Sequence, residues 1–504
     1  MSEKLDLIII PSDPASIVQT IAETLRSRLD VFLKGTDLIR VSVSSGMLAT
    51  EPLDAHGIVY AIHETHRPVV EKSRGGQSEF VPIELPLESV RRFLKCTDRW
   101  HFPEITGFAF SPLLRRTGAV DVTTGYDATT KTFVHHTGHF PLLGPRVDTR
   151  EFAAWFLQAV RALFASLPFA DSPRRDDGSG RAVVDISRPP GLAESTFLTA
   201  LFTCIARPSL PLAPGVAIRT PEISGSSTGG FAVRLLSAVA YGRPPRTVVP
   251  GRDDDQFDDR VAAALATDEP MLFVDGIDRT LRSNLLVRVL SEAKVPTRQF
   301  GRTSTQFLET GVTVAITGSG LRLAEDLLGS FLVVDFDAGI DHAAARRFPH
   351  FAEQFLEVIH TNRRSIVAAA LNIMSWGIRE SVPRGIPMGN FEDWGRMVRD
   401  PLVALGCMDP CKKNRLLAEE DPVCDPITEF FIRWAAVHGS SPVTAVTVAP
   451  EVLSVVNLSP RNRQQVAQYI SNLVDTRAGG YHLTRIRHGR WGASEYVLKC
   501  VSAA

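Results

Sequence analysis

The chain has 504 residues, 44% of them apolar and 22% charged, and its 55 Lys and Arg nearly balance its 56 Asp and Glu for a net charge of -1. This is ordinary globular composition, with room for roughly two to four domains. It excludes a disordered chain, a fibre and a disulfide-dense secreted module. It also excludes a protein that is basic throughout and coats nucleic acid. A net charge near zero is still compatible with one basic face.

The ends and the cysteines indicate a cytoplasmic protein. The first apolar run, residues 7–10, is too short for a signal peptide and lacks a basic n-region. No window approaches the roughly 18 consecutive apolar residues of a membrane helix. Six cysteines at irregular spacing are typical of a reducing compartment. We therefore expect a cytoplasmic chain with no membrane contact.

Two groups of potential metal ligands do not predict a metal site. The cysteines lack a fourth ligand at zinc spacing, so core or loop thiols are favoured over zinc. The histidines follow a strand-like run, and a solvated loop is favoured for them. The two groups are Cys407, Cys411 and Cys424, and His135, His136 and His139.

Residues 1–175 mix helical and strand-like patterns, which predicts an α+β N-terminal domain. The polar, Gly-containing residues 173–180 predict an exposed loop near its end. The predicted elements are helices at 17–29 and 151–167, strands at 38–43 and 57–62, and a strand–turn–strand at 125–133.

Residues 181–345 alternate short apolar runs with helical stretches, as in a parallel sheet with helices on both faces. The next segment, residues 346–424, is helical in pattern. Residues 425–504 show helices and then a strand pair, the order of a winged-helix-like module. The predicted strands of the α/β core are 182–186, 216–219, 271–274, 312–317 and 331–336, and the C-terminal elements are helices at 427–437 and 460–473 and strands at 481–486 and 493–501.

A Gly- and Ser-rich turn at residues 221–231 lies between a strand and a helix, where backbone N–H groups can bind phosphate. Compared with the template G-x-x-x-x-G-K-[ST], Gly229 takes the second glycine position, Gly230 the lysine position and Phe231 the hydroxyl position. Neither residue can replace the lysine or hold magnesium, and each lost charge-assisted hydrogen bond costs about 1.5–3 kcal/mol. A plain Gly-rich turn is the alternative. The candidate cofactor-binding residues are Gly225, Thr228, Gly229, Gly230, Asp275 and Ser319.

Two of these candidates come from strand ends. Asp275 ends an apolar strand, the position of a carboxylate that holds metal-bound water, although such an Asp also serves as a turn or cap. Ser319 lies in the polar tip at residues 317–320, where P-loop ATPases sense the γ-phosphate. The order of strand, Gly-rich turn, helix and acidic strand favours an ATPase-like core.

The order of segments resembles the helicase-like C-terminal module of primase–helicases from prophages, plasmids and integrative elements, which are hexameric AAA+ ATPases. The resemblance implies a P-loop NTPase-like (AAA+) core, a replicative helicase function, and ATP with Mg²⁺ as cofactors. It rests on Phe102–Gly107, Gly125–Thr130, Asp258–Leu265, Met271–Asp275, Arg298–Thr303, Thr317–Leu323, Phe391–Trp394, Val398–Arg399, Leu402–Gly406 and Asp409.

Departures from this family's pattern indicate that the chain has lost the ATP hydrolysis that drives a helicase. Besides Gly230 and Phe231, the family's sensor asparagines are replaced by Ser319 and Gly320. The arginine finger expected after Asp326-Leu327 is absent, and such a finger supplies roughly 10³–10⁵ in rate in related enzymes. We expect negligible ATP hydrolysis and hence no required cofactor. Asp275 would be catalytic only if ATPase activity is retained, and ATP and Mg²⁺ would bind only if the degenerate site still accepts them.

The C-terminal segment is basic. From residue 461 onward the chain has seven Lys and Arg residues but only two Asp and Glu residues. In a winged-helix module the helix enters the major groove and the wing contacts phosphates, which predicts salt-dependent DNA binding. A solvated basic face or a protein-docking surface is the alternative. The candidate DNA-binding residues are Arg461, Arg463, Arg485, Arg487 and Arg490.

The hypothesis is a degenerate replicative-helicase-like AAA+ protein of a mobile element. It would bind DNA and assemble with replication or element-encoded proteins, in a homo- or hetero-oligomeric ring or as an adaptor. One alternative is an active ATP-dependent helicase in which Arg219 or Arg234 replaces the lysine. Another is a structural or regulatory protein without a nucleic-acid role.

Overall fold

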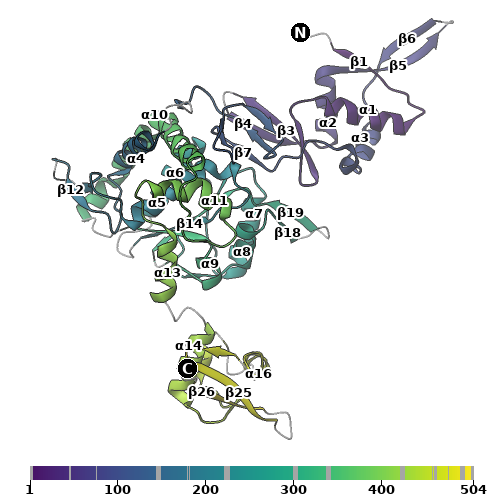
Figure 1. The fold of residues 1–504 in the computed structure, drawn as a ribbon. Helices are drawn as coiled ribbons and strands as arrows, with labels where there is room; N and C mark the ends of the chain where they lie inside the picture. The colour runs from purple at the N-terminus through teal and green to yellow at the C-terminus, as the bar shows by residue number, and fades with distance from the viewer. Residues whose placement is uncertain are drawn as a thin grey trace. The chain divides into compact units, whose positions relative to one another are not determined.

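The computed structural model describes residues 4–44, 47–74, 77–142, 149–178, 180, 182–220, 227–298, 305–319, 321–336, 342–420, 426–456, 458, 463–474, 476–488 and 494–500 (Figure 1). Contacts group the chain into a larger unit (1–279, 283–321 and 330–410) and a smaller unit (280–282, 322–329 and 411–504). Within the described ranges, no helix has both the length and the apolar character needed to cross a bilayer.

The larger unit begins with a small helix-and-sheet layer. Asp13 caps the first helix by accepting hydrogen bonds from the N–H groups of Ala15 and Ser16. Buried apolar residues of the three helices share one core with the strands. The elements are α1 (Pro14–Arg26), α2 (Ala55–Thr65) and α3 (Leu87–Leu94), with a sheet in the order β1 (Leu5–Ile8), β5 (His66–Arg74) and β6 (Gln77–Pro82).

The strand prediction for residues 57–62 is wrong, because this run lies inside α2. Asp54 caps the helix by accepting a hydrogen bond from the Gly57 N–H at 2.7 Å. Ile58, Ala61 and Ile62 are buried at helical spacing. The apolar run Ile58 to Ile62 is locally compatible with a strand, and the cap at Asp54 favours the helix instead.

A second group of strands links this layer to the core. The strand–turn–strand prediction at 125–133 is confirmed, since β10 pairs with β11 in antiparallel register. The strands are β2 (Val31–Lys34), β3 (Asp37–Ser44) and β4 (Met47–Pro52), the sheet of β7 (Gly107–Ala109), β10 (Gly125–Asp127) and β11 (Thr132–Val134), and the pair β8 (Leu113–Leu114) and β9 (Val120–Asp121).

A five-stranded parallel sheet forms the centre of the larger unit. Its order is β15-β16-β20-β14-β22. Four of the five predicted core strands are confirmed. The run at 182–186 is not in this sheet but forms β13 (Ala182–Val184), which pairs with β12 (Arg174–Asp176), so part of the predicted loop at 173–180 is a strand. The sheet consists of β14 (Gly215–Thr220), β15 (Thr247–Val248), β16 (Met271–Val274), β20 (Thr313–Ser319) and β22 (Phe331–Asp335).

Helices pack on the sheet and on one another. All fifteen residues of α5 (Leu192–Ala206) are buried. The long α10 (His342–Arg379) packs on α4 (Arg150–Phe164) and α6 (Ser227–Tyr241). Other elements are η2 (Arg207–Ser209), α7 (Asp254–Leu265), α8 (Asn284–Ser291), the hairpin of β18 (Lys294–Arg298) and β19 (Thr305–Glu309), α11 (Glu392–Trp394), a π-helical turn (Gly395–Arg399) and α12 (Asp400–Ala404).

The smaller unit contains the predicted C-terminal helices and strand pair. Its four-stranded antiparallel sheet has the order β23-β26-β25-β24, and its core includes Trp434, Ile470 and Leu483. The elements are β17 (Thr280–Leu281), β21 (Arg322–Leu323), α9 (Glu325–Leu328), α13 (Cys411–Glu420), α14 (Pro426–His438), β23 (Val443–Thr444), α15 (Pro450–Ser454), α16 (Arg463–Asn472), β24 (Arg477–Ala478), β25 (Tyr481–His488) and β26 (Ser494–Cys500).

Candidate functional site

The ends of three neighbouring strands form the candidate nucleotide site. Strand β20 lies between β14 and β16, and the three run parallel. The carboxyl ends of β14 and β16 therefore lie at one edge of the sheet, on either side of the end of β20. Ligands of open α/β sheets bind at this carboxyl edge. The fold thus brings the start of α6, which follows β14, close to Asp275, which follows β16.

Helix α6 begins with residues packed closely against the strand ends. A Cβ on Gly229 would lie 3.4 Å from Thr317 Cβ, and a Cβ on Gly230 would lie 3.1 Å from Asp275 Oδ2. Thr228, which precedes them, is buried. The first turn of α6 therefore lies close to the Asp275 carboxylate, and a side chain at position 230 would contact it tightly. Gly225 lies outside the described residues.

The Asp275 carboxylate is held at the end of β20. Thr317 Oγ1 donates a hydrogen bond to Asp275 Oδ1. The N–H groups of Gly276 and Ile277 both donate to the Thr317 carbonyl, at 3.1 and 2.9 Å. Gly276 adopts φ +86°, a conformation that favours glycine, and so lets the chain turn directly after the carboxylate.

Sequence reasoning missed two residues that build this edge, Thr317 and Gly318. It assigned the polar tip to Ser319, which is only half-buried at the last position of β20. A Cβ on Gly318 would come 1.7 Å from the Ile277 carbonyl oxygen, so only glycine fits beneath the turn. The available signal was the Thr-Gly pair at the end of an apolar strand, which indicates a side-chain donor followed by a close backbone approach.

The residues at and near the phosphate-binding positions are engaged elsewhere. Phe231 is buried, and its ring centroid lies 5.9 Å from that of Phe355 on α10. Arg219, one possible substitute for the lysine, forms a two-bond ion pair with Asp335 at 2.6 and 2.9 Å. Arg234, the other, is exposed on α6. The position of the magnesium hydroxyl has therefore become part of the core, and the Arg219 charge is already neutralised.

These residues do not fit Mg²⁺-ATP. The β- and γ-phosphates require a cation at the lysine position, and the metal requires a hydroxyl one residue later. Gly230 supplies no charge, and Phe231 supplies no oxygen. A triphosphate at this edge would instead meet the Asp275 carboxylate without a compensating lysine, and like charges at short range repel.

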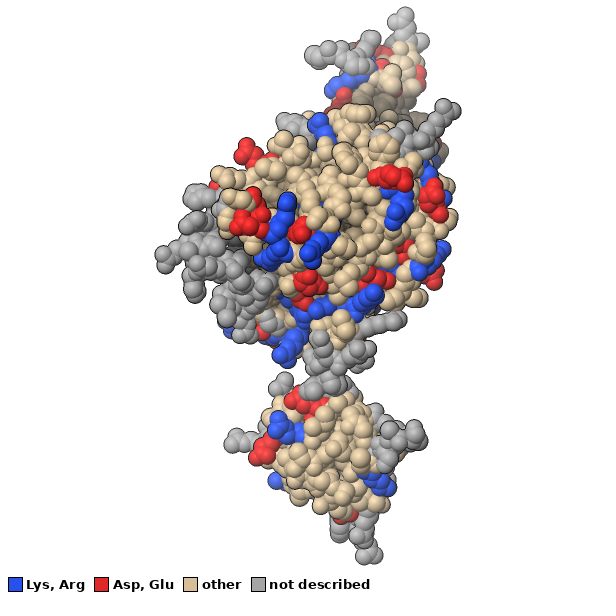
Figure 2. All heavy atoms as spheres, turned by 60° about the vertical axis from the view of Figure 1, so that its left-hand side comes forward, with Lys and Arg blue, Asp and Glu red and all other residues tan. Residues whose placement is uncertain are grey.

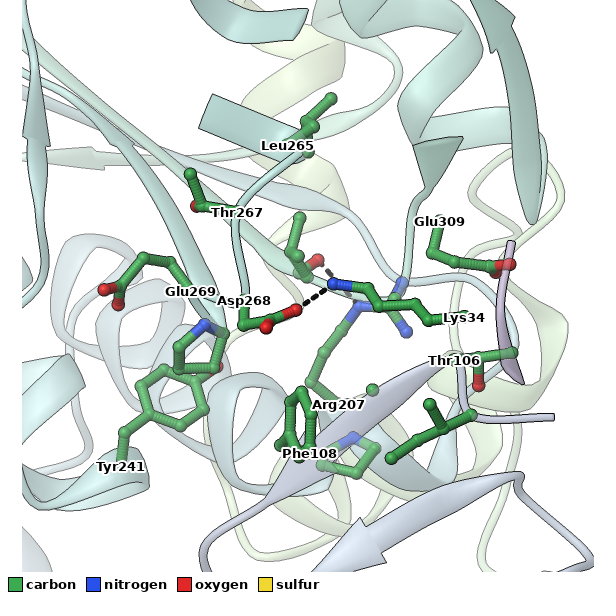
Figure 3. Close-up of a pocket in the computed structure, with 16 residues that line it drawn as sticks. Lys34, Thr106, Phe108, Arg207, Tyr241, Leu265, Thr267, Asp268, Glu269 and Glu309 are labelled. Carbon is green, nitrogen blue, oxygen red and sulfur yellow. Dashed lines mark hydrogen bonds and ion pairs between the residues drawn. The ribbon is translucent and has the colours of Figure 1, made fainter. Parts of the chain in front are cut away.

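A separate cavity lies at the opposite, amino edge of the sheet (Figure 3). Pro270 and Val312, which come just before β16 and β20, line it, and Lys34 reaches it from β2. Lys34 Nζ forms an ion pair with Asp268, and Thr50 Oγ1 donates to the same carboxylate. These contacts join the N-terminal strands to the α/β core.

Arg207 forms the floor of this cavity. Its guanidinium donates to the backbone carbonyls of Leu210, Thr310 and Val312, at 2.6, 2.8 and 3.0 Å. Burial lowers the pKa of Arg207 to about 10. Because these described polar groups are paired within the protein, we assign the cavity a structural role.

The predicted DNA-binding arginines are only partly within the described residues. Arg463 is exposed at the first residue of α16. Arg487 lies in β25 opposite Glu495, and nothing is described of its side chain. Arg461 and Arg490 lie outside the described ranges.

Arg485 does not have the environment predicted for it. Its Nη2 donates to Ser471 Oγ at 2.5 Å, and its guanidinium carbon lies 5.7 Å from the centroid of the Tyr496 ring. The side chain is half-buried. Arg485 is therefore engaged within the smaller unit rather than extended into solvent.

Neither group of potential metal ligands forms a cluster. Among the residues of described placement, no three His, Cys, Asp or Glu side chains converge on a common point. His135, His136 and His139 lie in the irregular segment after β11, as predicted for a loop, and the His136 ring packs 5.1 Å from that of Phe140. Cys407 and Cys411 are buried, and Cys424 lies outside the described ranges.

Comparison with known proteins gives weak similarity. No family model and no curated protein matches the chain. The chain is similar to the A form apo structure of the NrS-1 C-terminal region, with 9% identity and a TM-score of 0.33 over 96% of this chain and 99% of that one. It is also similar to SCCmec type IV Cch, described as an active helicase, with 9% identity and a TM-score of 0.34 over 92% and 91% of the two chains. Scores this low do not establish a shared fold.

Proposed function

We propose that this chain is a helicase-like protein, related to AAA+ ATPases, that binds DNA and does not hydrolyse ATP efficiently. The observation that carries the proposal is the meeting of Gly230 with Asp275, where a Cβ would lie 3.1 Å from the carboxylate. The start of α6 beside a carboxylate at the ends of parallel strands supports a core of the phosphate-binding kind. The lysine that would bind the phosphates and allow hydrolysis is replaced by Gly230.

The proposal keeps the four domains predicted from the sequence. These are an α+β domain at 1–175, an AAA+-like core at 181–345, a helical segment at 346–424 and a DNA-binding module at 425–504. We further propose that the chain acts in the cytoplasm, in replication of a mobile element such as a prophage. There it would assemble with replication proteins, in a mixed ring or as an adaptor.

The C-terminal elements support a winged-helix module. Their order is α14, β23, α15, α16, β24, β25 and β26, and β23 pairs with β26 beside the long β25–β26 pair. In helix-turn-helix proteins the last helix of such an arrangement enters the major groove, which gives α16 that role. The sequence predicts the tip of the wing at Arg487–Trp491, of which residues 489–491 lie outside the described ranges.

The distribution of charge favours the same module. On the face of the larger unit drawn in Figure 2, the described Lys and Arg side chains lie among Asp and Glu side chains. The C-terminal residues from 461 onward have seven basic and two acidic side chains. Phosphate contacts of such a segment would give binding that weakens steeply with salt.

The test uses the purified full-length chain in two assays. Fluorescence anisotropy with a 20-base-pair duplex should show binding that weakens as KCl is raised from 50 to 200 mM. A coupled ATPase assay should show the same rate for the native chain and for Asp275→Asn, at the level of a no-protein control. If the native chain hydrolyses ATP and Asp275→Asn abolishes this turnover, the proposed loss of ATPase activity is wrong. Absence of duplex binding at 50 mM KCl would overturn the DNA-binding part.

A fluorescent ATP analogue separates lost binding from lost turnover. Little binding by the native chain, with stronger binding by a Gly230→Lys/Phe231→Thr variant, would support the proposal. Because Phe231 packs against Phe355, Gly230→Lys alone is the matched variant that leaves the core intact. Micromolar binding together with turnover by the native chain would contradict it.

A further inference from the structure

We propose that Arg485 positions helix α16 and makes no contact with DNA, whereas Arg463, at the other end of the helix, makes a phosphate contact. This inference rests on the proposed DNA binding by the C-terminal module. It divides the basic residues of that module into a structural group and a contacting group. The first sign of the division is that Arg463 is exposed and Arg485 is half-buried.

Arg485 points to the core side of its sheet. In β25, Leu483 is fully buried, while Ile486, which follows Arg485 at a shift in the strand register, is 53% exposed. Side chains two positions apart in a strand share a face, so Arg485 lies on the same face as Leu483. Its cross-strand neighbour is Tyr496, which is buried, and its guanidinium lies over that ring at 5.7 Å.

The same guanidinium reaches the last turn of α16. Arg485 Nη2 donates to Ser471 Oγ at 2.5 Å, and Ser471 is the penultimate residue of this helix. The apolar side of the helix is fixed by Val466 and Ile470, which are buried in the module core. A cation near a helix C-terminus is also favoured by the helix dipole. Arg485 therefore links β25, β26 and the C-terminal end of α16.

The opposite end of α16 is available to a duplex. Arg463 and Gln464 are exposed in its first turn. Eight residues separate Arg463 from Ser471, which at about 1.5 Å per residue is roughly 12 Å along the axis. Recognition helices present their N-terminal residues to the groove. Arg485 thus contacts the C-terminal end of α16, and docking of this kind places that end away from the base edges.

The chemistry of arginine distinguishes the two roles. A planar guanidinium can cover an aromatic ring and hydrogen-bond at its edge, and an ammonium cannot reproduce both contacts. A phosphate, by contrast, accepts either cation. Lysine should therefore replace Arg463 well and Arg485 poorly.

The test measures duplex affinity of the full-length chain at several KCl concentrations for the four variants Arg463→Ala, Arg463→Lys, Arg485→Lys and Arg485→Met. Arg463→Ala should lower the magnitude of the slope of log K against log[KCl] by about 0.9, and Arg463→Lys should restore it. Arg485→Lys and Arg485→Met should both weaken binding about tenfold at every salt concentration without changing the slope. A lower slope for Arg485→Met that Arg485→Lys restores would overturn the inference.

Hydrogen exchange gives a readout that does not depend on DNA. The amides of α16 should exchange faster in both Arg485 variants than in the native chain or in Arg463→Ala, while the amides of α14 keep their protection and show that the module is folded. Equal protection of α16 in all variants would overturn the positioning role. If the native chain binds no duplex, the proposed function fails, yet loss of α16 protection in the Arg485 variants would still support the structural role.

Discussion

The two edges of the parallel sheet differ in how they use charge. At the carboxyl edge, Asp275 faces the glycines of α6 with only the Thr317 hydroxyl as its described donor. At the amino edge, Lys34 pairs with Asp268, and the guanidinium of Arg207 is surrounded by three backbone carbonyls. The amino edge is therefore held by charged side chains. The carboxyl edge also has the Arg219–Asp335 ion pair, but around Asp275 it is held by close backbone packing at Gly318.

The largest expected loss of stability comes from inserting a side chain into the closely packed carboxyl edge. Gly318→Val should destabilise the larger unit by about 4 kcal/mol or prevent folding, because its Cβ would overlap the Ile277 carbonyl oxygen. Urea unfolding followed by circular dichroism measures this. Gly107→Ala is the matched control, since nothing lies within 4 Å of its Cβ. Similar midpoints for the two variants would contradict the close packing.

A smaller loss is expected at the amino edge. Arg207→Leu removes the donor to the carbonyls of Leu210, Thr310 and Val312 and should lower the free energy of unfolding by about 3 kcal/mol, since buried acceptors are left unpaired. The exposed Arg234→Leu is the control and should change it by less than about 0.5 kcal/mol. A native-like urea midpoint for Arg207→Leu would show that water replaces the guanidinium.

Acid should weaken the strands beside the amino edge. Hydrogen bonds from Arg115 hold the pKa of Asp127 well below its usual range. A carboxyl group with a lowered folded-state pKa stabilises the protein above the unfolded pKa of about 4, and this contribution is lost as pH falls. Asp127→Asn should therefore cost about 2 kcal/mol at pH 7 and less at pH 3. Unfolding midpoints at both values test this, and the exposed Asp6→Asn should show little change at either.

The smallest effect is expected from restoring the missing cation. Gly230→Lys should change stability by less than about 1 kcal/mol, because an ion pair with Asp275 offsets the 3.1 Å contact of the new Cβ. Gly230→Ala adds the Cβ without the charge and should be the less stable of the two. ATP turnover should stay absent in both, because Phe231 still occupies the hydroxyl position. Turnover by Gly230→Lys would show that only one residue separates this chain from a motor.

Local pattern predicted much of the fold. Apolar runs identified β14, β16, β20 and β22, because buried parallel strands consist of such runs. The two-residue β15 was too short to leave a pattern. The run 57–62 was wrongly assigned as a strand, because the helix cap at Asp54 is not visible in an apolar pattern. The strand at 182–184 was identified, but its partner was not, because it pairs with residues 174–176 of the predicted loop and not with the parallel sheet.

The site was predictable only in part. Gly230 was identified from template spacing and Asp275 from its place at the end of an apolar strand, and the fold brings them together. The Thr317-Gly318 pair indicates a donor and a close backbone approach, but the partner of that approach depends on the path of the turn at 276–277 over β20. The engagement of Arg219 by Asp335 and of Arg485 by Ser471 likewise depends on which strands and helices become neighbours.

Helix α5 has a consequence for synthesis on the ribosome. Its fifteen residues are buried on every side, and two of its polar groups are partnered from far downstream, with Trp394 Nε1 donating to Thr203 and the Met408 N–H donating to Ser195. A nascent chain that has not yet emerged to about residue 410 therefore cannot cover this helix. The growing polypeptide must carry an apolar segment in need of chaperone protection for some two hundred residues, and expression fragments that end before this point should be insoluble.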